Sequence, residues 1–313
     1  NSEKTNENNN DSPLVYMDGS LHDITAFAPR HPGGSKILHK VAGKEIGEYM
    51  RGEHIEGIRH AHSEAAYKIL RKYAVSNSHE VDPLLASGRG ILCQIGSLGD
   101  KYWPWIHQPY DGKMRIFDSD ILETFTNTKW WMIPILWLPV AALFSIISLS
   151  HLSEDLGMVS GVIRWAICFT LGLLVWTMTE YIMHRFLFHF VPSPGSTIQI
   201  AFHFLLHGIH HKTPMDNDRL VLPPALGVSF FYIFYSIYTR ILPWPIVCAF
   251  LSGKTVGYVA YDCTHYYLHQ GTPKPGTFRH AQKVYHNTHH YKDSHEAYGV
   301  TSPLWDYVFS TVG

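Results

Sequence analysis

Two long runs of apolar residues mark the middle of the chain. Residues 130–150 carry no charged side chain, and residues 162–183 carry charges only near their ends, at Arg164 and Glu180. An α-helix needs about 20 apolar residues to cross the hydrocarbon core of a bilayer. Both runs therefore predict helices that span a membrane.

Two further runs, residues 220–242 and 244–261, are apolar but less regular. They are interrupted by Pro223, Pro224, Pro243 and Lys254. As membrane spans they complete a set of four; the alternative is a pair of helices buried inside the protein. We expect a mainly α integral membrane protein with a four-span transmembrane helical bundle, in a domain covering residues 129–313.

The pattern is different in residues 13–75, where strand and helix signals alternate over short segments. Alternating residues flank an Asp18-Gly19 dipeptide, which favours a tight turn between two strands, and a helical pattern follows near Ile37. A small α+β domain is predicted here. The preceding residues 1–12 are polar and rich in asparagine, a composition that predicts disorder.

Residues 76–128 are predicted to form a linker between these domains. Within them Asp118-Ser119-Asp120 precedes Ile121 and Leu122, as at the start of a helix. Tryptophans occur nearby, and tryptophan is enriched at membrane interfaces. We interpret the segment as a linker with a short interfacial helix; an ordinary interdomain connector is the alternative.

Composition narrows the classes of function. The chain has 313 residues, of which 46% are hydrophobic and 16% charged, and its formal net charge is −1. This balance gives no sign of a nucleic-acid partner. No C-x-x-C pair occurs among the cysteines, which argues against a disulfide framework and a thiolate zinc site and suits a reducing cytosolic face. The cysteines are Cys93, Cys168, Cys248 and Cys263.

Histidine carries the candidate chemistry. Four motifs, H-R-F-L-F-H, H-G-I-H-H, H-Y-Y-L-H and H-N-T-H-H, follow one another between residues 184 and 290. Neutral imidazole binds iron, copper, zinc and nickel well, and ten imidazoles exceed what one ion of coordination number four to six can use. The motifs therefore predict two metal ions. The candidate ligands are His184, His189, His207, His210, His211, His265, His269, His286, His289 and His290.

The spacing within each motif predicts which imidazoles converge. Residues three and four apart share one face of a helix, so the three histidines of each H-x-x-H-H motif are expected to aim at one point, as are His265 and His269. His184 and His189 are five apart and diverge by roughly 140° on an ideal helix. We expect that helix to end or distort between them. Three histidines without matching spacing are interpreted as supporting or surface residues: His203, His280 and His295.

Four spans would bring all the histidine motifs and both ends of the chain to one membrane face. The H-R-F-L-F-H and H-Y-Y-L-H motifs each stand at the end of a predicted span on that side. Basic residues are also frequent there, which the positive-inside rule associates with the cytosol, although Arg164 and Arg240 are exceptions. We expect a cytosolic histidine-rich dimetal cap. The basic residues are Lys129, Arg185, Lys212, Lys274, Lys283 and Lys292.

The N-terminal domain resembles the cytochrome b5 heme-binding domain. The resemblance rests on H-P-G-G at residues 31–34, A-G-K-E at 42–45 and H-S-E-A at 62–65. It implies that His31 and His62 are the axial ligands of heme b, a ligation that suits electron transfer. The interval between them is longer than in compact family members, so His54 and His60 are rivals to His62.

The four histidine motifs in a membrane bundle resemble the membrane fatty acid hydroxylase superfamily. The fused heme domain and the tail Y-G-V-T-S-P-L-W-D at residues 298–306 narrow the resemblance to fatty acid 2-hydroxylases. It implies two iron ions that use O2 to hydroxylate C2 of long-chain fatty acyl groups for sphingolipid and ceramide synthesis. Zinc can occupy such ligands in purified protein.

The same resemblance implies the surroundings of the enzyme. These are a multi-pass position in the endoplasmic reticulum membrane, a long-chain fatty acyl or ceramide substrate, and an NAD(P)H-dependent cytochrome b5 reductase as electron source. The number of electrons that such a reaction needs agrees with the presence of a heme domain in the same chain. Attack on an unactivated C–H bond with O2 needs two electrons delivered one at a time, which a fused one-electron carrier supplies.

Tyr261 and Asp262 stand just before His265 at the end of the fourth run. Carboxylates within membrane segments are usually functional, and ligating histidines commonly donate to a carboxylate. We interpret Asp262 as an orienter of a ligand or a contact to the substrate head group, with Tyr261 beside it. A helix cap or interfacial hydrogen bond is the alternative.

Two other functions stay open on the sequence alone. A desaturase or sterol-type oxidase would use the same di-iron centre, because hydroxylation and desaturation share the first C–H abstraction. A non-enzymatic membrane protein that binds heme and structural zinc is the second alternative. Oxygen-dependent product formation separates it from both enzymes.

Overall fold

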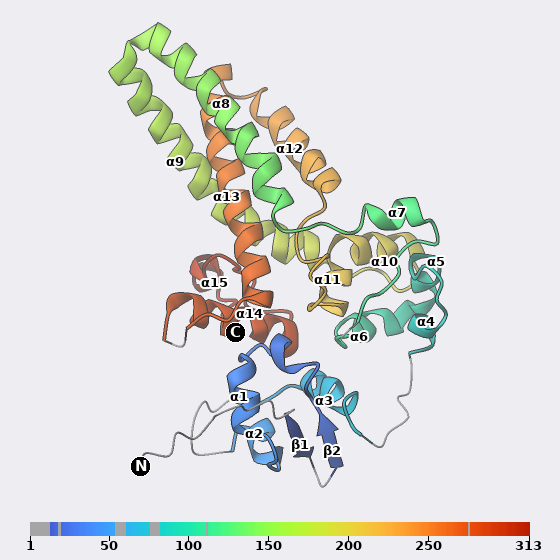
Figure 1. Cartoon of the computed structure of the whole chain (residues 1–313). Coiled ribbons are helices and arrows are strands. Elements are labelled where there is room, and N and C mark those ends of the chain that lie inside the picture. The colour runs from blue at the N-terminus through green and yellow to red at the C-terminus, as the bar shows by residue number, and fades with distance from the viewer. Residues whose placement is uncertain (1–12, 18–19, 54–60, 76–81, 111, 275) are drawn as a thin grey trace, which may run out of the picture. The chain divides into compact units, whose positions relative to one another are not determined.

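The computed structural model of the protein describes residues 13–17, 20–53, 61–75, 82–110, 112–274 and 276–313. The chain divides into two compact units, residues 1–80 and 81–313 (Figure 1). The boundary lies earlier than the end of the linker expected over residues 76–128. Residues 82–128 therefore belong to the second unit.

The first unit is an α+β domain. Strands β1 (Leu14–Met17) and β2 (Ser20–Asp23) pair in antiparallel register, so the expected hairpin is confirmed, while its turn at 18–19 lies outside the described residues. The helical elements that follow are η1 (Ala28–Arg30), α1 (Ser35–Lys40), α2 (Gly47–Arg51) and α3 (Glu64–Arg71). They enclose a core of Val15, Ile24, Ala28, Leu38, Ile46, Met50 and Leu70.

Residues 82–128 form a packed layer of short helices. These are α4 (Pro83–Ala86), α5 (Leu92–Ile95), η2 (Gly96–Lys101), α6 (Tyr102–Ile106) and α7 (Asp120–Thr124). Ile91, Ile95 and Ile106 are buried together with Ile200 and Phe204. Burial of apolar surface stabilises by about 25 cal/mol per Å², which explains why this segment packs with the second unit instead of acting as a connector.

The short helix expected after Asp118 is present as α7. The Ser119 hydroxyl accepts a hydrogen bond from the backbone N–H of Leu122 at 3.5 Å and caps the helix. Ile121 and Phe125 are 73% and 68% exposed. The helix thus presents a small apolar surface outward.

Four longer helices form a bundle: α8 (Met132–Leu156), α9 (Met158–Ile182), α12 (Pro224–Tyr238) and α13 (Trp244–Gln270). Helix α13 packs against both α8 and α9. A Cβ atom at Gly172 would lie 2.0 Å from the Phe250 carbonyl oxygen, and one at Gly253 would lie 2.0 Å from that of Phe169. Only glycine permits α9 and α13 to make this backbone contact.

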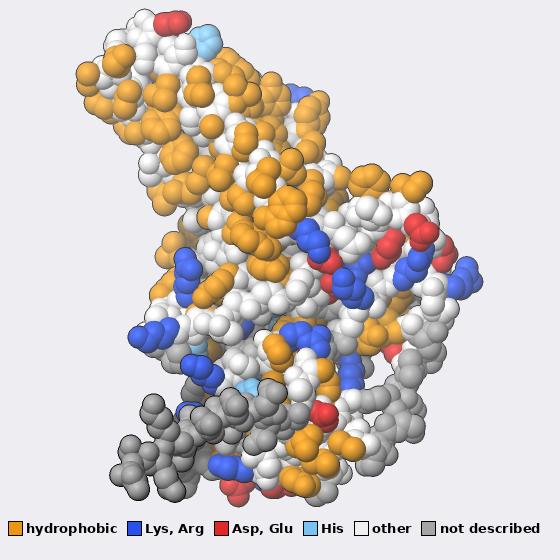
Figure 2. All heavy atoms as spheres, viewed as in Figure 1, with side chains coloured by type: hydrophobic (Ala, Val, Ile, Leu, Met, Phe, Trp, Pro, Cys, Tyr) orange, Lys and Arg blue, Asp and Glu red, His pale blue; other side chains and the backbone are white. Residues whose placement is uncertain are grey.

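The outer surface of the bundle is apolar. Hydrophobic side chains cover its visible face in Figure 2, whereas charged side chains gather around its base. Within the described residues, two helical segments are long and apolar enough to cross a membrane, Met132–Leu156 and Met158–Phe188. Helix α12 is shorter, with 15 residues, and α13 buries most of its side chains. The protein is mainly helical, with two apolar helices of membrane-spanning length.

The base of the second unit consists of shorter elements and the C-terminal tail. These are η3 (Met183–Phe188), α10 (Thr197–His203), η4 (Phe204–Gly208), α11 (Ile209–Lys212), α14 (Phe278–Tyr291) and α15 (Leu304–Phe309). Elements η3 and η4 are π-helical turns that continue from α9 and α10.

Asp306 organises the C-terminal tail. Its buried carboxylate accepts hydrogen bonds from the backbone N–H groups of Tyr298 and Gly299 at 2.9 and 2.8 Å, and from the Thr311 hydroxyl at 2.8 Å. A buried acceptor stabilises the fold only while its donors stay in place. The tail motif at residues 298–306 is therefore a loop closed by its last residue.

Replacing Asp306 with alanine should leave the buried backbone N–H groups of Tyr298 and Gly299 without an acceptor, whereas the Thr311 hydroxyl keeps the Tyr181 hydroxyl as a partner at 2.9 Å. Each such group costs about 1–3 kcal/mol, so we expect a clear fall in the midpoint of thermal unfolding in detergent. Asp293→Ala, at an exposed aspartate, is the matched control and should keep the wild-type midpoint. Equal midpoints for both variants would contradict this role of Asp306.

Candidate metal centre

All ten predicted histidines are buried, and the structure sorts them into two groups of five. Within each group, one ring nitrogen of every imidazole lies within 4.8 Å of one ring nitrogen of each of the others. Such convergence is the arrangement of a metal site. We call His184, His189, His207, His211 and His289 group 1, and His210, His265, His269, His286 and His290 group 2.

A π-helical turn places His184 and His189 in the same group. Residues 183–188 form η3, and the backbone N–H of His189 donates to the His184 carbonyl at 3.1 Å. This bond joins residues five apart, as in a π-helix, and brings side chains of that spacing onto one face. The expected distortion between the two histidines is confirmed.

Each H-x-x-H-H motif contributes to both groups. His207 and His211 belong to group 1 while His210 belongs to group 2, and in α14 His289 is separated from His286 and His290 in the same way. The expectation that each motif aims at one point is therefore wrong. Residues four apart share a helix face, but adjacent residues point about 100° apart, so neighbouring histidines reach different positions.

Backbone carbonyls orient three of the rings. The Nδ1–H groups of His184, His265 and His289 donate to the carbonyl oxygens of residues 298, 220 and 296, at 2.5, 2.9 and 2.7 Å. A carbonyl can only accept, so Nδ1 carries the proton and Nε2 keeps its lone pair. These hydrogen bonds fix both the tautomer and the ring orientation that a metal ligand needs.

Within group 2, Nε2 atoms of different rings face one another. The Nε2 atoms of His210 and His290 are 2.9 Å apart, and those of His269 and His286 are also 2.9 Å apart. Burial lowers the pKa of His210, His211 and His290 well below the ordinary imidazole value, because desolvation disfavours the charged ring. Neutral imidazoles with converging nitrogens fit a metal ion in each group.

His107 lies beside group 1 and was missed in the sequence analysis. Its ring centroid is 5.2 Å from that of His211 and 4.7 Å from that of Trp103. It comes from the end of α6, far from the four motifs, so no spacing rule could identify it. His203 is hydrogen-bonded to the Tyr102 hydroxyl at 2.6 Å, which agrees with its interpretation as a supporting residue.

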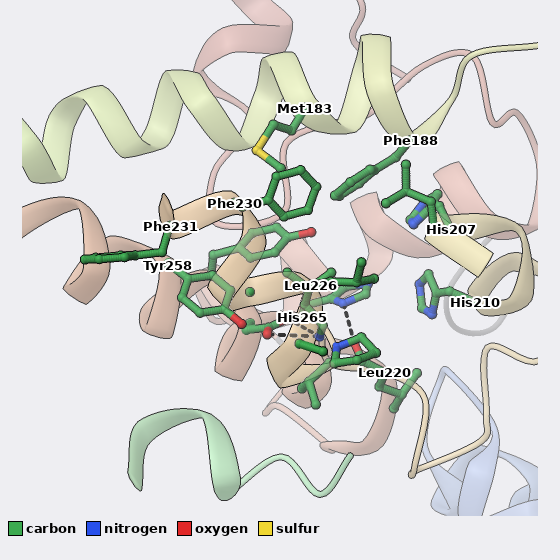
Figure 3. A pocket seen from close by; sticks show the side chains of 18 of the residues that line it. Met183, Phe188, His207, His210, Leu220, Leu226, Phe230, Phe231, Tyr258 and His265 are labelled. Carbon is green, nitrogen blue, oxygen red and sulfur yellow. Dashed lines mark hydrogen bonds between the residues drawn. The ribbon is translucent and has the colours of Figure 1, made fainter. Parts of the chain in front are cut away.

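A cavity of about 340 Å³ extends from the histidine groups into the bundle (Figure 3). Its lining on α13 runs from Leu251 to His265, a distance of about 21 Å at 1.5 Å per residue. His207 and His210 also line it. The walls are mostly apolar, as is typical of small-molecule sites, and include Trp137, Trp176, Met183, Phe188, Leu226, Phe230, Phe231 and Tyr258.

Asp262 and Tyr261 line the same cavity and connect to His265. The Asp262 carboxylate accepts from the backbone N–H of Leu222 at 3.1 Å, two residues after Leu220, whose carbonyl orients the His265 ring. Tyr261 stacks on His265 with ring centroids 6.0 Å apart and planes inclined by 10°. The link from Asp262 to the histidine thus runs through the 220–222 segment.

Two of the predicted surface cations are buried. The Lys212 ammonium donates to the carbonyls of residues 105 and 108 at 3.1 and 3.0 Å, and that of Lys283 donates to the carbonyls of residues 269 and 271 at 3.2 and 2.9 Å. Burial lowers the pKa of Lys283 to about 8. Lys212 and Lys283 hold the helices that carry the histidines, so they do not count as surface charges on a cytosolic face.

In the first unit, His31 and His62 face each other. Their ring centroids are 6.3 Å apart and their planes are inclined by 31°. A Cβ atom at Gly33 would lie 2.9 Å from Cε1 of His31, so the glycine makes room for the ring. Two opposed imidazoles fit the axial ligation of a heme iron. The rival candidates His54 and His60 lie outside the described residues.

Two family models match the chain. One, described as a cytochrome b5-like heme/steroid binding domain, matches residues 1–78, and the other, described as fatty acid hydroxylase, matches residues 169–311. The solved structure of full-length scs7p, in which only the hydroxylase domain is visible, is 38% identical with a TM-score of 0.64. The match covers 72% of this chain and 84% of that one.

Curated relatives match across both domains. Fatty acid 2-hydroxylase from Mus musculus is 34% identical over 95% of this chain and 90% of its own length. Ceramide very long chain fatty acid hydroxylase from Saccharomyces cerevisiae is 33% identical over 96% and 90%. A dihydroceramide fatty acyl 2-hydroxylase from Arabidopsis thaliana is 42% identical over 71% and 90%. This chain belongs to the fatty acid 2-hydroxylase family.

Proposed function

We propose that this chain adds a hydroxyl group to C2 of long-chain fatty acyl groups of sphingolipids and ceramides, with O2 as oxidant. The observation that carries the proposal is the cavity, a long apolar space that ends at imidazoles of both histidine groups, His207, His210 and His265. Such a space suits an acyl chain. With the carboxyl end nearest the base of the bundle, C2 lies beside the histidines.

The ten histidines would hold two iron ions, one in each group of five. An iron pair supplies the reductive activation of O2 that hydroxylation of an unactivated C–H bond requires. The protein keeps the ligands neutral by burial and oriented by carbonyl hydrogen bonds. Asp262 and Tyr261 support His265, and their place in the cavity wall also makes them candidate contacts to the acyl head group.

Heme b would be held by His31 and His62 in the first unit. We propose that electrons pass one at a time from an NAD(P)H-dependent cytochrome b5 reductase to this heme, and from the heme to the iron pair. The opposed imidazoles at 6.3 Å support this assignment. Bis-histidine ligation leaves no open position for O2, which suits an electron carrier.

We propose a position in the endoplasmic reticulum membrane with four crossings, and with the heme domain and the histidine groups on the cytosolic side. The apolar surfaces of α8 and α9 support two crossings. Helices α12 and α13 complete the same bundle, and the exposed side chains of Ile121 and Phe125 on and after α7 suit contact with the membrane interface.

The two redox sites should be separable by mutation. His31→Ala should remove the heme absorption and the turnover while iron content stays intact. His207→Ala should keep the heme and lose activity by more than the roughly 10–100-fold that loss of an outer hydrogen-bond partner costs. Absorption spectra, metal analysis and product mass spectrometry measure the three quantities, and His39→Ala, at an exposed histidine, is the control. Full turnover by a heme-free variant given NAD(P)H and reductase would refute this order.

The proposed orientation can be tested at Asn10-Asp11-Ser12, an N-glycosylation acceptor pattern outside the described residues. A cytosolic N-terminal region never meets the glycosylation machinery, so we expect no glycan on Asn10 in a secretory-pathway host. Ser12→Ala, which removes the pattern, should migrate identically on a gel. A glycosidase-sensitive shift present only with Ser12 would reverse the orientation.

Zinc and iron should give opposite activities. Zinc binds imidazole sites more tightly than Fe(II) in the Irving–Williams order, so overexpressed protein is expected to carry zinc. Because zinc has no accessible redox change, that protein should be inactive even with reduced heme. Hydroxylation should rise in proportion to bound iron after reconstitution, measured by metal analysis beside product formation. An iron-free, zinc-loaded preparation that hydroxylates would disprove the di-iron assignment.

A further inference from the structure

The C-terminal helix α15 carries an uncovered apolar surface. Leu304, Tyr307 and Val308 are 53%, 68% and 57% exposed. Residues three and four apart share one face of a helix, so these side chains lie together on one side of α15, which we call its outer face. Contiguous exposed apolar surface marks a place of contact with a protein or a membrane.

The opposite side of α15 is docked on α9. The Trp305 indole N–H donates to the Thr177 hydroxyl at 3.0 Å, and the Phe309 ring stacks on that of Tyr181 with centroids 5.3 Å apart. Just after α15, the Thr311 hydroxyl oxygen lies 2.9 Å from that of Tyr181. Helix α15 is therefore held at the levels of Thr177 and Tyr181, at the base of the bundle (Figure 1).

The charges of α9 and η3 show where these levels lie relative to a membrane. Arg164 and Arg185 enclose a segment in which the sequence has one other charged residue, Glu180, whose side chain is buried. At a rise of 1.5 Å per residue the two arginines are about 32 Å apart. This length matches the hydrocarbon core of a bilayer, which is about 30 Å thick.

Helix α15 is docked inside this apolar segment and not beyond it. On the same scale Thr177 and Tyr181 precede Arg185 by about 12 and about 6 Å. Their neighbours on α9, Met178 and Ile182, are exposed apolar residues. The outer face of α15 thus lies at the depth where interfacial helices bury their apolar side, at the boundary of acyl chains and head groups.

We propose that α15 is inserted in the membrane and that its outer face contacts lipid acyl chains, on the side of the bilayer nearest the histidine groups. This rests on the proposed membrane position, because it takes α9 as a span. Lipid removes the outer face from water, which favours the docked position of α15. A soluble protein partner could reach this face only by entering the apolar layer.

The membrane contact is linked to the metal centre by two hydrogen bonds. Within α15, the Asp306 carboxylate accepts from the backbone N–H of Tyr298, and the carbonyl of Tyr298 accepts from the Nδ1–H group of His184. A bilayer that holds α15 in place therefore also holds the residue that orients a predicted metal ligand.

The test identifies the molecules that lie against Tyr307. The photoreactive residue benzoylphenylalanine replaces Tyr307 in the full-length protein, which is reconstituted in phosphatidylcholine nanodiscs and irradiated, and adducts are measured by mass spectrometry of peptides. We expect a phospholipid adduct in a yield comparable to that of the same probe at Leu174. Leu174 is 57% exposed on α9, midway between the two arginines.

A probe at Asp293 is the negative control. This aspartate is exposed, and an exposed charged side chain lies in water and not in lipid. Its lipid adduct should fall to the level of an unirradiated sample. If the variant at Tyr307 fails to fold, the probe at Leu304, on the same outer face, decides the question.

The outcomes separate this inference from the membrane position on which it rests. If Leu174 is labelled while the outer face gives no more lipid adduct than Asp293, the inserted α15 is overturned and the span is kept. Crosslinks from the outer face to a peptide of this chain or of a second copy, in place of lipid, also overturn it. Absence of lipid adducts at Leu174 would instead refute the proposed membrane position.

Discussion

The structure depends on keeping ten imidazoles neutral while they are buried at the base of a largely apolar bundle. Burial favours the neutral ring, but each ring then has one N–H to satisfy and one lone pair to direct. Carbonyls from the tail and from the segment before α12 satisfy His184, His265 and His289. The same bonds attach these segments to η3, α13 and α14. Asp306 extends this support, since it holds the N–H of Tyr298 while the carbonyl of Tyr298 holds His184.

Sequence patterns predicted the parts of this arrangement that local rules govern. The hairpin, the two long apolar helices, the distortion between His184 and His189 and the set of ten clustered histidines all follow from spacing within a few residues. The sequence patterns did not predict features that depend on the direction of a side chain around its helix or on contact between residues far apart in the sequence. His210 and His211 belong to different groups because adjacent residues diverge, and His107 reaches group 1 only through the packing of α6.

Charge was the least reliable guide, because a sequence shows the number of cations and not their burial. In the sequence, Lys212 and Lys283 look like ordinary surface cations of a positively charged face. In the structure, both donate to backbone carbonyls inside the protein. Lys254 interrupts an apolar run and weakens its prediction as a membrane span, but in the structure its ammonium is buried and donates to the hydroxyl groups of Thr179 on α9 and Tyr238 on α12. The apolar side chains of residues 82–128 are spread too widely in sequence to predict the core that some of them share with Ile200 and Phe204.

The division of each H-x-x-H-H motif has a consequence for assembly. Helices α11 and α14 each contribute to both groups, so the rotation that seats His211 in group 1 also seats His210 in group 2. Neither group of five histidines can be complete while α11 or α14 is rotated away from this orientation. If each group held an ion, the binding of both ions would depend on the docking of the same two helices, because metal binding energy is also folding energy when ligands come from several elements.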